Sequence, residues 1–64
     1  VIEGEESWIS PNNVQISESA VIKNSVILDN CIIEDNVTIS DSIISSDSII
    51  TAGTIINKEI IRKD

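Results

Sequence analysis

Isoleucine recurs in this sequence at a spacing that matches neither the helical period of about 3.6 residues nor the alternation of a plain strand. Isoleucines stand five or six residues apart at Ile22, Ile27, Ile33, Ile39, Ile44, Ile50 and Ile56. The sequence also aligns with itself, because one shift lays Ser25-Val26-Ile27 on Ser42-Ile43-Ile44. A short strand followed by a turn, repeated about every six residues, produces this register. The sequence therefore predicts a solenoid.

The residues between these isoleucines predict tight corners and a narrow interior. Asn30, Asn36 and Gly53 share one position in their repeats, and both residue types tolerate the left-handed backbone of a sharp corner. Strands of about three residues, stacked at ~4.8 Å, would build three flat parallel sheets around a triangular core. The expected inward ladders are Ile16, Ile33 and Ile50 beside Val14, Cys31 and Ser48; Ile22, Ile39 and Ile56 beside Ala20, Val37 and Thr54; and Ile27, Ile44 and Ile61 beside Ser25 and Ser42.

The two ends of the sequence depart from the repeat. We interpret residues 1–9 as a linker and N-terminal cap, residues 10–61 as the solenoid, and residues 62–64 as a polar tail. Applied backward, the shift that relates Ser42 to Ser25 places Trp8 in the same slot, which is too narrow for an indole. We therefore expect Trp8 either to cover the open first coil as a lid or to contact a domain upstream. The absence of methionine favours a domain excised from a longer protein over a processed chain.

The repeat resembles the hexapeptide repeat of left-handed parallel β-helices, in which a small residue stands four places after an aliphatic one. This form is present in I-S-E-S-A-V (16–21) and I-E-D-N-V-T (33–38). The stretch from Asn24 to Ile44 is most similar to the C-terminal domains of sugar-1-phosphate nucleotidyltransferases, such as mannose-1-phosphate guanylyltransferase and the glucose-1-phosphate enzymes. The resemblance covers residues 10–61 and implies an all-β, left-handed parallel β-helix of about three coils. The hand is implied by the resemblance alone, because the general crossover rule favours the right hand.

The resemblance implies a non-catalytic structural, oligomerisation or regulatory domain of a cytoplasmic enzyme. That enzyme would make NDP-sugars from a sugar 1-phosphate and an NTP, with Mg²⁺ and catalysis in an upstream domain. The Gly-rich nucleotide loop and metal-binding aspartates of that domain have no counterpart here, so no catalytic, cofactor-binding or metal-binding residue is expected in this chain. Two alternatives stay open, a stand-alone β-solenoid binding protein or a fragment of a hexapeptide acyltransferase. Against an ice-binding solenoid, which presents threonine ladders, only one of nine outward residues is threonine.

Composition excludes several other chemistries. The sequence has no histidine, so it lacks both the general base of the acyltransferases and the zinc ligands of γ-class carbonic anhydrases. Its net charge of −7 repels phosphate backbones, so we expect no nucleic-acid partner. No apolar run approaches the ~18 residues of a membrane span. The single cysteine, Cys31, falls in an inward slot; we interpret it as a core residue in a reducing, cytoplasmic setting.

The outward-facing residues carry the functional prediction. The position just before each core isoleucine points to solvent, and six of the eight such positions from residue 15 to residue 55 are aliphatic. Exposed apolar patches of this kind mark interfaces. We expect the partner to be the upstream catalytic domain, another copy of the domain, or both. The predicted interface residues are Val26, Ile32, Ile43, Ile49, Ile55 and Ile60.

Overall fold

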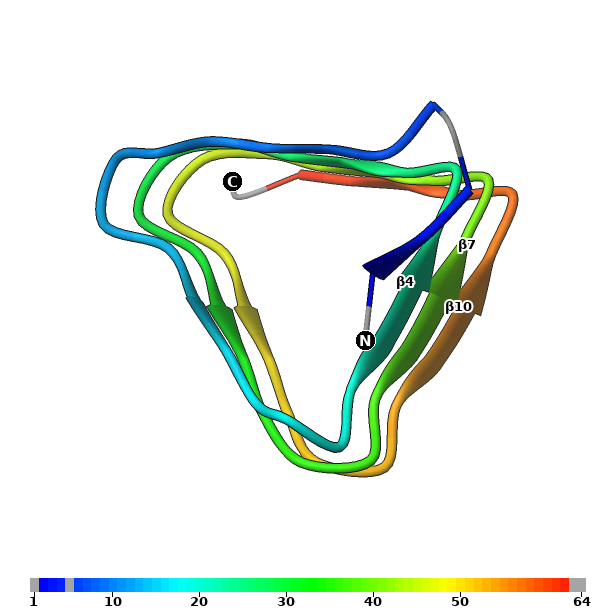
Figure 1. Cartoon of the computed structure of the whole chain (residues 1–64). Coiled ribbons are helices and arrows are strands. Elements are labelled where there is room, and N and C mark those ends of the chain that lie inside the picture. Colours follow the sequence, from blue (N-terminus) through cyan, green and yellow to red (C-terminus); the bar gives the residue numbers. More distant parts are fainter. Residues whose placement is uncertain (1, 5, 63–64) are drawn as a thin grey trace.

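The computed structural model describes residues 2–4 and 6–62, which form a triangular parallel β-solenoid of about three coils (Figure 1). Each coil contributes one short strand to each of three sheets. Sheet A contains β1 (Ile2–Glu3), β4 (Val21–Lys23), β7 (Thr38–Ser40) and β10 (Ile55–Asn57). Sheet B contains β2 (Trp8–Ile9), β5 (Val26–Ile27), β8 (Ile43–Ile44) and β11 (Ile60–Ile61). Sheet C contains β3 (Gln15–Ile16), β6 (Ile32–Ile33) and β9 (Ile49–Ile50). The predicted all-β solenoid is confirmed.

The strand register follows the predicted constant offset from β3 onward. In sheet A, Ile22 pairs with Ile39 and Ile39 pairs with Ile56, all in parallel strands. The pairs in sheets B and C that start from β5 and β3 keep the same offset. Because side chains alternate between the two faces of a strand, a constant offset stacks like residues in columns.

The interior consists of the predicted ladders. Its buried apolar residues are Ala20, Ile22, Ile27, Cys31, Ile33, Val37, Ile39, Ile44, Ile50 and Ile56. The small side chains of Ser25, Ser42 and Ser48, which also point inward, are buried as well. Partly buried residues packed against the core are Ile9, Val14, Ile16 and Ile61. β-Branched side chains suit this arrangement, because they favour extended backbone and pack closely on their own copies in neighbouring coils.

The first coil is longer than predicted. Ile2 pairs with Ile22, three places beyond the partner that a constant offset gives, and Trp8 pairs with Val26, one place beyond. Two extra residues in the corner before β2 and one extra residue in the corner before β3 account for both differences. The predicted uniform register is therefore wrong for this coil. Corners lie at the surface, outside the stacked strands, so they accept extra residues without disturbing the ladders.

The extra residue in the corner before β3 turns Trp8 outward, so the predicted lid is wrong. Trp8 stands opposite Val26 on the outer face of sheet B and is 51% exposed. Ser7 instead takes the position that Ser25 and Ser42 hold in the later coils. Its Oγ donates to the Glu3 carbonyl at 2.6 Å. A contact between Trp8 and an upstream domain stays a prediction.

The predicted boundaries of the solenoid stay predictions. Within residues 1–9, interpreted above as a linker and cap, β1 and β2 are strands of sheets A and B. Residues 1 and 5 of that segment lie outside the described residues. Of the polar tail, residues 62–64, the structure describes only Arg62.

The corners use left-handed backbone, as the sequence indicated. The predicted corner residues Asn30, Asn36 and Gly53 have φ angles of 59°, 57° and 80°. Positive φ angles also occur at Gly4, Asn13, Asn24, Asp41, Asp47 and Lys58. Glycine and asparagine adopt this region most readily, whereas a lysine there is strained by its Cβ.

We expect Lys58→Asn to stabilise the chain. Lys58 has a φ of 55° and shares its corner position with Asn24 and Asp41 in the preceding coils. Asparagine tolerates this conformation better, so the free energy of unfolding should rise by about 0.5–1 kcal/mol. Urea titration of both proteins measures the change. A Lys58→Ala variant, which keeps the strain and removes the charge, is the control and should show no such gain.

Serine hydroxyls connect successive coils at the corner between sheets A and B. Ser25 Oγ donates to the Lys23 carbonyl at 2.9 Å and accepts the Ser42 N–H at 3.1 Å. Ser42 Oγ donates to the Ser40 carbonyl at 2.7 Å and accepts the Glu59 N–H at 3.0 Å. Glu59 occupies the next place in this row, is exposed and offers no hydroxyl. The row of inward serines therefore satisfies backbone groups as well as filling a narrow slot.

Candidate interaction surface

The predicted interface residues lie on the outer faces of all three sheets. Sheet B carries Val26, Ile43 and Ile60; sheet C carries Ile32 and Ile49; sheet A carries Ile55. Five of them are exposed, from 37% for Ile32 to 75% for Ile55, and Val26 is half-buried. The structure confirms that they face outward. That a partner covers them stays a prediction.

Sheet B has the most apolar outer column because Trp8 joins it. The column runs from Trp8 through Val26 and Ile43 to Ile60 without a polar side chain. The corresponding column of sheet C begins with Gln15, and that of sheet A contains Thr38. Sequence reasoning gave Trp8 the register of the inward serines and expected it to form a lid or to contact an upstream domain, and so omitted it from the predicted interface.

The signal for Trp8 was present in the sequence. Trp8-Ile9 forms the same outward–inward pair as Val26-Ile27, one place away from the register of the later coils. Only the length of the Pro11-Asn12-Asn13 corner conceals the match.

The apolar column of sheet B provides a modest driving force for association. Trp8, Ile43 and Ile60 are 51%, 41% and 60% exposed. Complete burial of one large apolar side chain is worth roughly 1.5–3 kcal/mol, so covering three half-exposed ones is worth on the order of 3 kcal/mol. This free energy is enough to favour one partner over another, but it is too small to hold a stable complex by itself.

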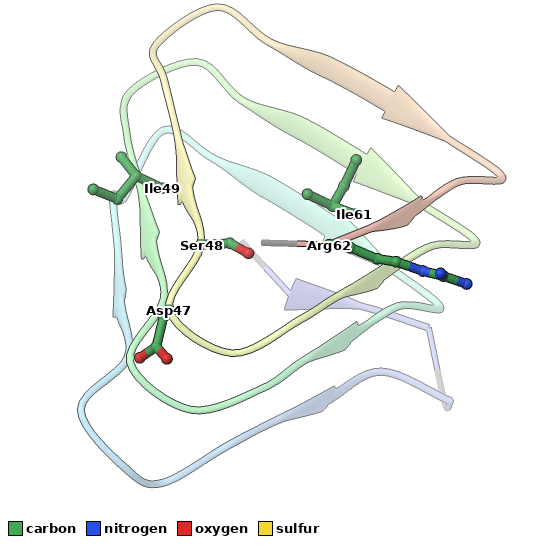
Figure 2. A pocket seen from close by; sticks show the side chains of 5 residues that line it. All are labelled: Asp47, Ser48, Ile49, Ile61 and Arg62. Atoms are coloured by element: carbon green, nitrogen blue, oxygen red, sulfur yellow. The ribbon is translucent and has the colours of Figure 1, made fainter. Parts of the chain in front are cut away.

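A hollow of about 270 Å³ lies at the C-terminal end of the solenoid. Asp47, Ser48, Ile49, Ile61 and Arg62 line it, and Figure 2 shows these side chains around the end of the last coil. Ser48 Oγ lies 3.4 Å from Ser45 Oγ, and the sequence has no histidine to activate a hydroxyl. The lining includes Ser48 and Ile61, which are the last residues of two core ladders.

Cys31 is a core residue, as predicted. It is fully buried, and its thiol is free. Its Sγ lies 3.1 Å from the Ser45 carbonyl oxygen, to which the thiol donates a hydrogen bond. A buried thiol without a base beside it behaves as a small apolar side chain.

The carboxylates of the corners take part in local hydrogen bonds. Asp29 accepts the hydroxyl of Ser10, and Asp35 accepts the hydroxyl of Ser17 in the preceding coil. Across residues 2–4 and 6–62, no three His, Cys, Asp or Glu side chains gather closely enough to hold a metal ion. Within the same residues, no helix is long and apolar enough to cross a membrane.

Comparison with known proteins agrees with the coil geometry. Neither a curated protein nor a solved structure matches this chain. A family model described as "GlmU-like, C-terminal hexapeptide" matches residues 2–63, which is nearly the whole sequence. The match confirms the predicted hexapeptide repeat and supports its assignment to the C-terminal domain of a nucleotidyltransferase-like protein. The stacked coils and the family match lead to one conclusion, that this chain belongs to the GlmU-like C-terminal hexapeptide family.

Proposed function

We propose that this chain is a non-catalytic assembly domain in a cytoplasmic enzyme that makes NDP-sugars from a sugar 1-phosphate and an NTP. Catalysis, and the Mg²⁺ that accompanies it, belong in this proposal to an upstream domain. The observation that carries the proposal is the set of aliphatic side chains exposed on flat outer faces, among them Ile43, Ile49, Ile55 and Ile60. Apolar patches on an otherwise strongly acidic surface favour a partner that covers them.

Two further observations support a structural role. Membership in a C-terminal hexapeptide family fits a domain that follows another part of a protein. The polar side chains described above are engaged in holding the coils together: Ser25 and Ser42 bind backbone groups, and Asp29 and Asp35 accept serine hydroxyls. These side chains stabilise corners, and none of them is paired with a group that would make it a nucleophile or a general base.

The proposal predicts that Ile43→Lys together with Ile49→Lys abolishes assembly and leaves the fold intact. Both residues face outward, so the inward ladders do not change. Burying unpaired ammonium groups in an interface costs several kcal/mol, which exceeds the gain from the apolar column. Light scattering and sedimentation on the protein that carries this sequence measure assembly, and circular dichroism verifies folding.

Matched controls are Gln15→Lys and Thr38→Lys, which add the same charge at exposed outward positions without removing an aliphatic side chain. We expect the controls to assemble at least partly. If the double Ile→Lys variant keeps both its assembly and its nucleotidyltransferase activity, the assembly role is wrong.

A further inference from the structure

We draw no further inference here: the strongest candidate, the hollow at the C-terminal end of the solenoid that Asp47, Ser48, Ile49, Ile61 and Arg62 line, carries no proposal because nothing in the structure shows what covers it.

Discussion

Ile39→Ala should leave little of the native structure at room temperature. Ile39 is fully buried, and its strand neighbours Ile22 and Ile56 lie directly above and below it in the core ladder. Removing three carbon atoms from such a site leaves a cavity and costs about 2–5 kcal/mol. A domain of this size has only a few kcal/mol of stability to lose. Thermal and urea denaturation, followed by circular dichroism, measure the effect.

Thr38→Ala is the control for this experiment. Thr38 precedes Ile39 on the same strand, but it is exposed on the outer face of sheet A. Its replacement should change stability by no more than about 0.5 kcal/mol. If both variants melt within a degree or two of the parent, Ile39 does not stabilise the core as its position implies.

Ser25→Ala should have the next largest effect, even though it removes a single oxygen atom. The hydroxyl accepts the N–H of Ser42, which is itself a buried residue of the next coil. Alanine would leave that N–H without its acceptor in the interior, at a cost of about 1–3 kcal/mol. The Lys23 carbonyl loses one donor but keeps the Asp41 N–H at 3.0 Å. Equilibrium unfolding in urea gives the difference.

Ser42→Ala is an internal control for the buried N–H. It removes the same pair of hydrogen bonds, but the N–H that it releases belongs to exposed Glu59, where water can replace the hydroxyl. We expect Ser42→Ala to cost less than Ser25→Ala. Equal losses for the two variants would mean that the hydroxyls contribute by filling space, not by satisfying buried backbone.

Sequence reasoning gave the repeated coils almost completely, and the reason is physical. The interior admits isoleucine at one place of each repeat and a small residue two places before it, so Ile22, Ile39 and Ile56 recur at a fixed interval and can be found by shifting the sequence. Corner residues are constrained less tightly. Asn30 and Gly53 were recognisable as left-handed. Lys58 shows no such preference and adopts a φ of 55° where it repeats the corner of the preceding coil, to which its N–H is bonded through the Ser40 carbonyl at 3.0 Å. The hand of the coil stays a prediction from the family resemblance.

The first coil could not be predicted in the same way. A corner outside the core imposes no fixed length, so the sequence contains no repeat that marks the extra residues before β2 and β3. The resulting shift moved Trp8 from an inward slot to the apolar face of sheet B. The outward direction of Ile43 and Ile60 followed from alternation, but the choice of sheet B over sheets A and C depended on Trp8.

The parallel stacking of coils has a consequence for how the molecule opens. Each paired strand contacts only the strands one coil away, so β4, β5, β6, β7 and β8 have neighbours on both sides and the other strands on one side only. Such a stack behaves as a one-dimensional array in which an end unit can detach while the rest remains intact. Amide hydrogens of the middle coil, such as that of Ile33, should therefore exchange only through global unfolding, and those of the end coils through local fraying. Proteases would then cut the end coils before the middle coil.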